Sequence, residues 1–390
     1  MRKAGLWLGG AALAAVLPAA AHAGTVDVEP SGKTSRVAVR AAAGEANRVV
    51  VRSDGATVIV RDRGAPLVAG NGCLQATANR VTCAFPAFVE ALVELKGGKD
   101  RVRVRGAFLR LVAFGGPGAD RITGGPRTDV LDGGAGPDVL DGRGSVDVAT
   151  YLERNQGVRV TLADGKRNDG GKVDGAQRDL LRRMEHVFGG NGNDVLVGDG
   201  KVNSLFGGPG RDLLRGRGGD DDLIGGTGND RAFGGPGDDL FPGDTGRDRS
   251  FGQGGADHFQ GAGAGSGPDL FAGGKGRDTA QYSFGSVRLS LDGEANDGRC
   301  ADPACTSSDE GDNLVSIEIL QAGFGDDVLI GSKAAEEFSP SRGADTVLAR
   351  GGDDVIEVSE DGDPDVYNCG AGVDSIVGMP DAFDMNPNCE

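Results

Sequence analysis

The chain has 390 residues, a formal net charge of −17 and 71 glycines, while aromatic residues make up only 5% of it. Glycine averages about 7% of protein residues, and a chain this rich in glycine and poor in aromatics is ill suited to one compact core. Two alternatives remain: a disordered chain, or a thin repetitive fold in which each unit packs only on its neighbours. The acidic balance argues against nucleic acid as the main partner and suits a protein that collects cations.

Residues 1–23 have the pattern of a secretory signal peptide. A charged start at Arg2 and Lys3 precedes a short apolar run, and Ala21-His22-Ala23 forms an A-x-A cleavage site. The apolar run is short for a membrane span, and no other stretch approaches its length. We therefore predict a secreted, extracellular protein with no membrane span in the mature chain. An uncleaved anchor is the alternative.

Residues 24–113 contain several short β-like runs, such as Thr57-Val-Ile-Val and Arg101-Val-Arg-Val, which are separated by glycine or polar turns. Clear copies of the repeat that follows are absent from this part of the sequence. Because a solenoid needs atypical ends to cover its exposed core, we predict that residues 24–113 form a β-rich N-terminal cap.

From Gly115 onward the sequence repeats in nines. Each unit reads G-G-x-G-x-D-x-U-x, where U is usually a large apolar residue, so that acids recur every nine residues. There are 18 such acid positions, and 16 of them are aspartate, while Asn203 and Glu336 occupy the other two. The aspartates lie in three tracts: 114–150 with Asp120, Asp129, Asp138 and Asp147; 189–281 with Asp194, Asp212, Asp221, Asp230, Asp239, Asp248, Asp257, Asp269 and Asp278; and 322–357 with Asp327, Asp345 and Asp354.

The chemistry of this unit indicates a calcium site. The x-U-x segment is a very short strand whose apolar residue points inward, and glycine reaches the positive φ that a sharp turn requires. Tight glycine turns direct several carbonyls to one side, and calcium takes six to eight oxygen ligands, which carbonyls and an aspartate together supply. Disorder does not explain the apolar residue two places after the acid, and a metal-free solenoid does not explain the acid.

The unit resembles the calcium-binding nonapeptide of RTX (haemolysin-type) proteins, over about half of the chain. The resemblance implies an all-β fold, a parallel β-roll or β-solenoid, in which two nonapeptides make one turn. Each loop would then share calcium with the loop two repeats later, so that Asp120 would pair with Asp138 and Asp129 with Asp147. The 16 aspartates are the candidate ligands for roughly eight to ten calcium ions, at two carboxylates per ion. We expect weak sites or none in the third tract, which contains Glu336.

Two segments, 151–188 and 282–321, interrupt the repeat and resemble each other. Each starts at a tyrosine, Tyr151 or Tyr282, and continues with an alternating strand and an Asn-Asp-Gly turn. We predict inserted coils that continue the solenoid. They look like inserts found between the RTX blocks of exported actinobacterial proteins.

The six cysteines form three local couples. An exported chain with an even number of cysteines implies disulfides, and six cysteines allow 15 connectivities. Proximity in sequence favours Cys73–Cys83, Cys300–Cys305 and Cys369–Cys389, of which the last would close a C-terminal cap at 358–390.

The sequence lacks a catalytic motif. It has only three histidines, no H-E-x-x-H, no G-x-S-x-G and no P-loop ending. We therefore predict a calcium-binding protein with a structural or binding role that folds on binding extracellular calcium, and not an enzyme. One alternative is a cell-surface adhesin or matrix component, whose partners would be cell-surface or matrix polymers. Another is a solenoid enzyme acting on polysaccharide, since paired carboxylates occur throughout the chain.

Overall fold

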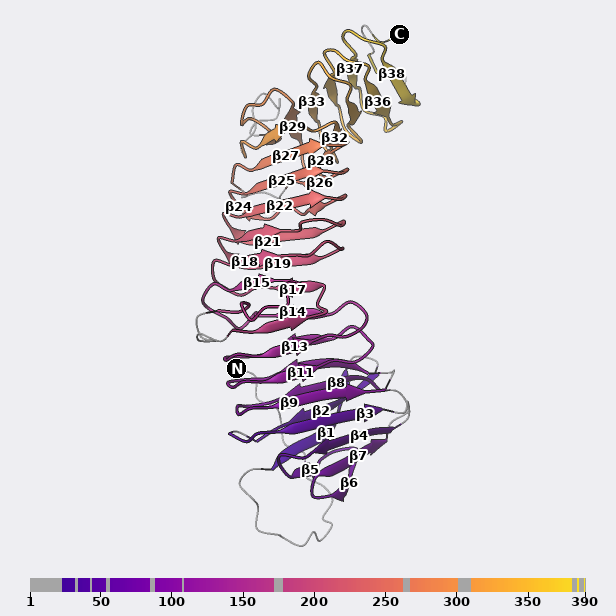
Figure 1. Cartoon of the computed structure of the whole chain (residues 1–390). Coiled ribbons are helices and arrows are strands. Elements are labelled where there is room, and N and C mark those ends of the chain that lie inside the picture. The colour runs from indigo at the N-terminus through magenta and orange to yellow at the C-terminus, as the bar shows by residue number, and fades with distance from the viewer. Residues whose placement is uncertain are drawn as a thin grey trace.

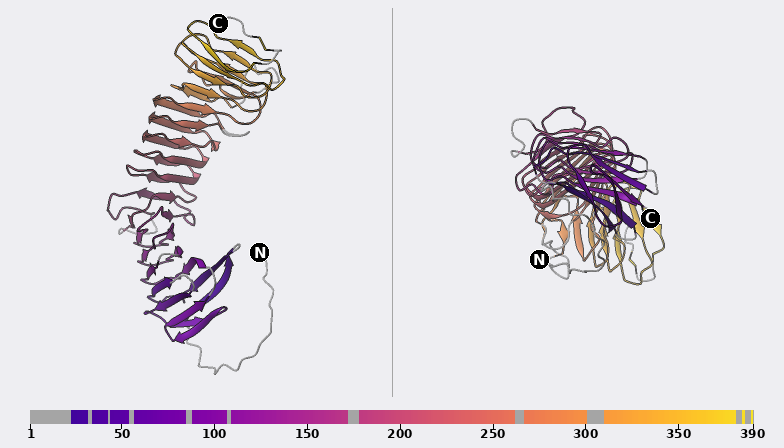
Figure 2. Two further views of the ribbon diagram at one scale, coloured as in Figure 1. Left: turned by 90° about the vertical axis from the view of Figure 1, so that its right-hand side faces the viewer. Right: turned by 90° about the horizontal axis from the view of Figure 1, so that it is seen from below.

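The strands of the chain stack into a long, bowed rod (Figures 1 and 2). The computed structural model describes residues 23–31, 34–42, 44–53, 57–84, 88–106, 109–171, 178–261, 267–300, 310–380, 384–385 and 389. The described residues form strands and turns with no helix, which confirms the predicted all-β fold. Within the same residues, no helix exists that could span a membrane. The predicted signal peptide falls on 1–23, of which 1–22 lie outside the described residues.

Two parallel walls run along the rod and face each other across its core. The long wall is a continuous parallel ladder from one end of the rod to the other. Its strands are β2 (Thr34–Arg40), β8 (Phe88–Glu94), β10 (Arg110–Phe114), β12 (Val130–Asp132), β14 (Val148–Thr150), β17 (His186–Phe188), β19 (Ser204–Gly210), β21 (Asp222–Gly228), β23 (Leu240–Phe241), β26 (His258–Gln260), β28 (Thr279–Gln281), β32 (Ile319–Gln321), β34 (Glu337–Ser339), β36 (Val355–Val358) and β38 (Ser375–Gly378).

The opposite side, here called the segmented wall, consists of three sheets. The first has β3 (Arg48–Ser53), β9 (Arg101–Arg105), β11 (Arg121–Thr123), β13 (Val139–Asp141) and β16 (Leu180–Arg182); the second has β15 (Arg159–Thr161), β18 (Val195–Val197), β20 (Leu213–Arg215), β22 (Arg231–Pro236), β25 (Arg249–Gly254), β27 (Leu270–Lys275) and β31 (Asn313–Val315); the third has β29 (Val287–Ser290), β33 (Val328–Ile330), β35 (Thr346–Leu348) and β37 (Val366–Asn368).

The register of both walls has the period of two nonapeptides. Val130 pairs with Val148 in the long wall, and Leu213 pairs with Arg231 in the segmented wall, so that partners lie two repeats apart. Each nonapeptide therefore supplies one strand, and the chain alternates between the walls. This arrangement confirms the predicted parallel β-roll. The second tract contains a longer coil, in which Arg249 pairs with Leu270 and not with the residue two nonapeptides later.

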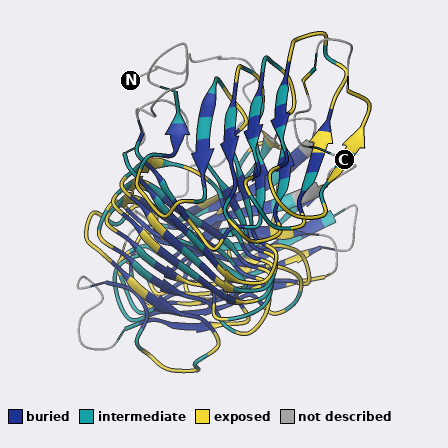
Figure 3. Cartoon of the chain, turned by 90° about the horizontal axis from the view of Figure 1, so that it is seen from above, coloured by how far each residue is buried: buried dark blue, intermediate teal, exposed yellow. Residues whose placement is uncertain are grey.

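The apolar residue of each repeat fills the space between the walls. Ile122, Leu131, Leu196 and Leu205 are 0% exposed, and burial of each such side chain stabilises the fold by about 1.5–3 kcal/mol. Figure 3 shows the strands buried along the core and the turns exposed at its edges. Because side chains alternate between faces along a strand, one apolar residue in a three-residue strand is enough to line the core.

The two inserted segments have the same topology. In the first, β15 begins the second sheet of the segmented wall before β16 completes the first sheet. Antiparallel bridges pair Arg159 of β15 with Gly170, and Asp169 with Asp179, the residue before β16. In the second, β29 begins the third sheet before β31 completes the second, and β30 (Gly298–Arg299) lies antiparallel to β29. Each insert thus connects two consecutive sheets of the segmented wall at the point where a repeat tract ends. Residues 172–177 and 301–309 lie outside the described residues.

The N-terminal end combines parallel and antiparallel pairing. Strands β2, β3, β8 and β9 already belong to the two parallel walls. Antiparallel strands extend the walls at this end: β1 (Gly24–Ser31), β4 (Thr57–Asp62), β6 (Cys73–Thr77) and β7 (Arg80–Ala84), while β5 (Leu67–Ala69) pairs parallel to β1. The sheet therefore ends in hairpins, a form that suits a cap.

Two of the three predicted disulfides are present. Cys73–Cys83 joins paired residues of β6 and β7 with an S–S distance of 2.04 Å, and Cys369–Cys389 ties the C-terminal segment to the last coils with an S–S distance of 1.96 Å. The predicted Cys300–Cys305 pair includes Cys305, which lies outside the described residues. Both described disulfides lie near the ends of the rod.

The first glycine of a repeat has no room for a side chain. A Cβ atom on Gly207 would lie 2.4 Å from Asp212 Oδ2 and 2.5 Å from the Gly225 carbonyl oxygen. Neither neighbour can move easily, because Asp212 is 2% exposed and the Gly225 oxygen belongs to the backbone of the next coil on the same side. The repeat pattern therefore requires glycine here for steric reasons.

We expect Gly207→Ala to lower the free energy of unfolding by about 1–3 kcal/mol, because overpacking forces neighbouring atoms to shift. Gly200→Ala is the matched control, since a Cβ on Gly200 would meet nothing within 4 Å. Urea unfolding of both variants in calcium buffer tests this expectation. Equal stabilities of the two variants would contradict it.

Candidate metal centre

The aspartates of the repeat form ladders along both walls. The backbone amide of each acid donates a hydrogen bond to the carboxylate of the acid one coil later. Asp212 donates to Asp230 Oδ1 over 2.6 Å, and Asp221 donates to Asp239 Oδ1 over 2.8 Å. Because successive coils repeat this contact, each carboxylate is fixed by the backbone of the coil before it.

The structure brings together the acids that the sequence predicts to be neighbours. Asp120 donates to Asp138 Oδ1 over 2.7 Å, and Asp129 donates to Asp147 Oδ1 over 2.8 Å. Asn203 lies in the long wall, so its position leaves the ladder of the segmented wall intact.

The 16 candidate ligands divide between the walls. Those that precede strands of the long wall are Asp129, Asp147, Asp221, Asp239, Asp257, Asp278 and Asp354; those that precede strands of the segmented wall are Asp120, Asp138, Asp194, Asp212, Asp230, Asp248, Asp269, Asp327 and Asp345. All 16 are buried, with exposed fractions of 0–8%. Full burial is unusual for aspartate unless it is paired or binds a metal.

A second carboxylate oxygen is left over at most of these residues. It is buried and accepts no hydrogen bond within the described part of the chain. The aspartates whose Oδ2 shows this are Asp120, Asp147, Asp212, Asp221, Asp230, Asp239, Asp257, Asp278, Asp327, Asp345 and Asp354. An unsatisfied buried oxygen carries a desolvation penalty of about 1–3 kcal/mol, and more when it is charged. A bound cation would remove that penalty.

Backbone carbonyls lie next to these oxygens. The space beside Gly207 that a Cβ would occupy borders both Asp212 Oδ2 and the carbonyl oxygen of Gly225, and Gly189 has the same surroundings from Asp194 Oδ2 and the Gly207 oxygen. Carboxylate and carbonyl oxygens are the ligands that calcium takes in proteins. The donor set thus fits calcium.

Two loops satisfy the second oxygen internally. Gly125 donates its amide to Asp129 Oδ2 over 2.6 Å, and Gly190 donates to Asp194 Oδ2 over 2.7 Å. In these loops the second carboxylate oxygen already accepts a hydrogen bond, so a bound cation would offset a smaller desolvation penalty.

The third tract departs from the ladder at one residue. Glu336 turns its carboxylate to Ser332 in its own loop, with the Ser332 amide donating over 3.2 Å and the Ser332 hydroxyl also in contact. Asp327 still donates to Asp345 Oδ1 over 2.9 Å, as in the other tracts. The third tract therefore departs from the ladder at Glu336, while the contact between Asp327 and Asp345 is the same as in the other tracts.

The inserts extend the ladders with acids that the sequence reading did not assign. Asp138 donates to Asp179 Oδ1 and Asp269 donates to Asp312 Oδ1, each over 2.8 Å. In the long wall, Asp147 donates to Glu185 Oε2, and Asp278 to Glu318 Oε2, each over 2.9 Å. A sequence signal exists for all four acids, since each is followed two positions later by a large apolar residue, as in the repeat: Leu181, Val187, Leu314 and Leu320.

Each insert also contains a buried tyrosine against its ladder aspartate. Tyr151 donates its hydroxyl to Asp179 Oδ2 over 3.2 Å, and Tyr282 donates to Asp312 Oδ2 over 2.5 Å. The tyrosines are 1% and 2% exposed. In the inserts a hydroxyl therefore satisfies the oxygen that remains open in most repeats.

The ladders continue past the repeat tracts at both ends. Asp100 donates to Asp120 Oδ1 over 2.8 Å, and Asp345 donates to Asp365 Oδ1 over 2.8 Å. Asp354 likewise donates to Asp374 Oδ1 over 3.0 Å. None of these outer acids was among the candidate ligands, although Asp100 follows a Gly-Gly pair and Asp374 follows Asp365 by nine residues.

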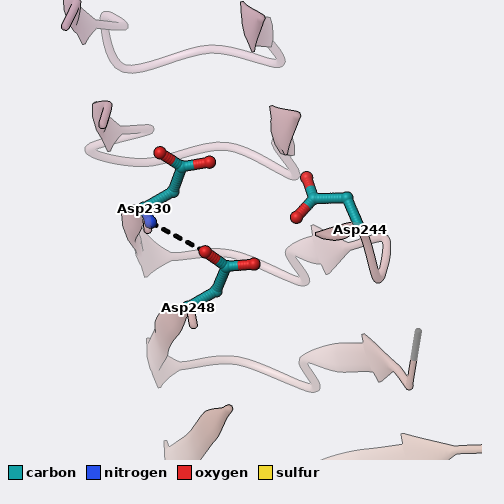
Figure 4. Close-up of side chains that lie close together, drawn as sticks. All are labelled: Asp230, Asp244 and Asp248. Atoms are coloured by element: carbon teal, nitrogen blue, oxygen red, sulfur yellow. Dashed lines mark hydrogen bonds between the residues drawn. The ribbon is translucent and has the colours of Figure 1, made fainter. Parts of the chain in front are cut away.

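Asp244 is an additional acid at a position where the repeat has glycine. Its carboxylate and those of Asp230 and Asp248 approach one another within 4.8 Å (Figure 4). The Gly226 amide donates to Asp244 Oδ2, which holds this side chain toward the other two. The sequence signal is the acid in Gly243-Asp244-Thr-Gly, where the second glycine of the repeat is replaced.

A small cavity adjoins this cluster. Its volume is about 20 Å³, and Ala232 and Ser250 line it at positions where most repeats have a large apolar residue. Asp230, Asp244 and Asp248 also line the cavity. A space of this size holds one water or one ion.

Burial disfavours the charged form of the ladder aspartates. Burial, together with the smaller effect of nearby carboxylates, raises the pKa of Asp147 and Asp212 to about 7 and the pKa of Asp345 to about 8. Hydrogen bonds from the backbone act in the opposite direction but are outweighed. Near neutral pH the roll thus holds rows of carboxylates that need a counter-charge.

We expect the calcium-free chain to lose stability as the pH rises from about 5 to about 8. The ordinary pKa of aspartate is 3.8 and the folded pKa is about 7 for Asp212, so the folded state binds more protons in this window and deprotonation favours unfolding. Thermal unfolding in excess chelator measures the effect. A midpoint that rises with pH across this window would contradict the assignment.

Comparison with known families matches these loops. A family model described as the RTX calcium-binding nonapeptide repeat (4 copies) matches residues 114–149, 188–223, 215–249, 224–259, 316–335 and 341–363. These matches lie in the parts of the chain that form the regular ladders. No curated protein matches the chain. The repeats are calcium-binding modules with a structural role, and the chain contains RTX calcium-binding nonapeptide repeats in all three tracts.

Proposed function

We propose that this chain is a secreted protein that folds into a rigid rod when it binds extracellular calcium, with a structural or binding role and no catalytic activity. The observation that carries the proposal is the set of buried Oδ2 atoms that accept no hydrogen bond, for example in Asp212, Asp221 and Asp230. Each is a ligand atom without a partner, in a position fixed by the neighbouring coil.

Calcium would be held between successive loops on the same side of the roll. The proposed ligands are the 16 aspartates of the repeats together with loop carbonyls, and Asp244 would add a carboxylate beside Asp230 and Asp248. We expect several ions per chain. When bound, calcium supplies positive charge and satisfies oxygens that the protein leaves open.

Folding and binding are coupled in this proposal. Without the ion, each coil buries carboxylates whose raised pKa values reflect an unfavourable charged state. A ligand that binds only the folded state stabilises it by about 2.7 kcal/mol when its concentration is 100 times its Kd. Several such sites would together decide whether the roll forms.

Secretion fits the chemistry of the chain. Disulfides form and persist in oxidising compartments outside the cytosol, and Cys73–Cys83 and Cys369–Cys389 are both formed. The signal-peptide pattern of residues 1–23 supports the same location. Folding would then wait until the chain reaches a calcium-rich medium.

Calorimetric titration of the unaltered chain and of single-substitution variants with calcium tests the proposed ligands. Asp221→Asn retains an oxygen that can accept the Asn203 amide, which now donates over 2.7 Å to Asp221 Oδ1, but it removes the charge. We expect the variant to bind about one ion fewer and to lose about 2–3 kcal/mol of stability in calcium.

Asp220→Asn is the matched control. Asp220 is the preceding residue and is exposed, so this variant changes the net charge equally without changing the ladder acid. Identical stoichiometry and stability in the two variants would argue against Asp221 as a ligand. A stoichiometry near zero for the unaltered chain would refute calcium binding altogether.

A further inference from the structure

The N-terminal part of the chain has the opposite charge to the rest. Residues 24–113 contain 14 basic and 8 acidic side chains, a net of +6, whereas the whole chain has −17. Charge segregation of this kind in one molecule favours different partners for its two parts. The calcium proposal concerns the acidic part and leaves the basic part without a role.

Arginines of the basic part converge on one outer face. In β9, Arg101, Arg103 and Arg105 are exposed, while the alternate residues Val102 and Val104 are buried. Because alternate residues of a strand share a face, the three guanidinium groups of this strand all point away from the core.

The neighbouring strands present arginine on the same face. Arg48 of β3 pairs with Arg101, and Arg52 of β3 pairs with Arg105. On the other side of β3, Arg61 of β4 pairs with Val50. Seven arginines in all, with Arg63 at the end of β4 included, line a groove of about 460 Å³.

This groove lacks carboxylates to balance its charge. None of the seven arginines forms an ion pair within the described part of the chain, and no acid lines the groove. The long wall at the same end is different. There, Arg36 pairs with Glu29 at 3.0 Å, and Arg40 pairs with Glu29 at 2.6 Å. The arginines of the groove are thus unbalanced, although acids occur in the same region.

Like charges directly opposite each other on a sheet destabilise it. The pairs Arg48–Arg101 and Arg52–Arg105 are such contacts, and Arg121 of β11 adds a third against Arg101. An anionic ligand would relieve this repulsion. Repulsion between paired arginines therefore destabilises the sheet, and a bound anion would reduce that repulsion.

The spacing of the arginines suits a polymer with recurring anions. Adjacent strands lie about 4.8 Å apart, and alternate residues along a strand lie about 6.7 Å apart. The planar guanidinium group binds carboxylate or sulfate through two parallel hydrogen bonds. Rows of such groups match a chain in which each unit, or every second unit, carries an acid group.

Other occupants fit less well. Single-stranded nucleic acid binds on aromatic stacking platforms, and the groove is lined by arginine, valine and isoleucine only. Double-stranded DNA is read by elements that enter its grooves, whereas this face is hollow. A second copy of the chain buries its ladder aspartates, and its exposed acids, such as Asp220, Asp238 and Asp353, lie on the turns and not along a strand.

We propose that the groove formed by β3, β4 and β9 binds an acidic polysaccharide through its carboxylate or sulfate groups. The proposal goes beyond calcium binding and does not rest on it, since none of the residues of the groove belongs to the ladders. It gives the rod one end that attaches to an anionic matrix.

Binding of the full-length chain in calcium buffer to labelled oligogalacturonate and to dextran sulfate tests the proposal, with neutral dextran as the reference polymer. We expect Arg101→Gln/Arg103→Gln/Arg105→Gln to weaken binding at least tenfold and to reduce its salt dependence. The matched control Arg211→Gln/Arg231→Gln/Arg249→Gln removes three exposed arginines from the roll, and we expect its affinity to stay within about twofold of the unaltered chain.

Folding of the variants is checked independently. The triple variant in β9 should bind as many calcium ions as the unaltered chain and should melt at the same or a higher temperature, because it relieves repulsion between arginines. Arg48→Gln/Arg52→Gln provides a second variant on another strand and should also weaken binding. Which of the two charged polymers binds more tightly identifies carboxylate or sulfate as the preferred group.

Three results would overturn the proposal. The first is undiminished binding by both groove variants, and the second is equal binding of neutral dextran. The third is tighter binding to duplex DNA or to vesicles of phosphatidylglycerol than to either charged polysaccharide, with the same dependence on the groove arginines, which would assign the face to another class of partner.

Discussion

The burial of aspartate in rows is the constraint on which the rest of this molecule depends. Each ladder aspartate of the repeats has one oxygen bound to the backbone of the preceding coil, and at most positions its second oxygen has no partner within the described part of the chain. The first oxygen fixes the spacing of the coils. The second creates a demand for positive charge, because a buried carboxylate is unfavourable unless it is compensated. Stacking and cation binding are thus two consequences of the same side chain.

Glycine and the inserts serve this constraint in different ways. Gly207 leaves room for Asp212 and for the carbonyl of the next coil, which no larger residue would do. The inserts replace nonapeptides with longer segments, but they return an acid to the ladder of the segmented wall at Asp179 and Asp312. They return one to the ladder of the long wall at Glu185 and Glu318. Their tyrosine hydroxyls meet the oxygen that most repeats leave open. The inserts therefore preserve the stacking contact while they reduce the local demand for a cation, so that the two roles of the aspartate are separable within one chain.

Much of the fold was predictable because the repeat is local and periodic. An acid every nine residues with an apolar residue two places later fixes the strand, the turn and the coil, and the 18-residue register follows from the two-repeat turn that the resemblance implies. Features that depend on contacts across the walls were not predictable in this way. Asp244 interrupts the pattern, and its approach to Asp230 depends on how the turn folds back. The arginine groove arises only when β3 and β9, far apart in sequence, pair in parallel.

The central claim is that calcium drives formation of the roll, and the most direct measurement compares the chain in excess calcium and in excess chelator near neutral pH. Far-UV circular dichroism reports the β-structure, and the hydrodynamic radius reports compaction of the same sample. The account predicts β-rich spectra and a compact rod with calcium, and an expanded chain with little regular structure in chelator, reversed on adding calcium back. A spectrum and a radius that do not change between the two conditions would contradict it.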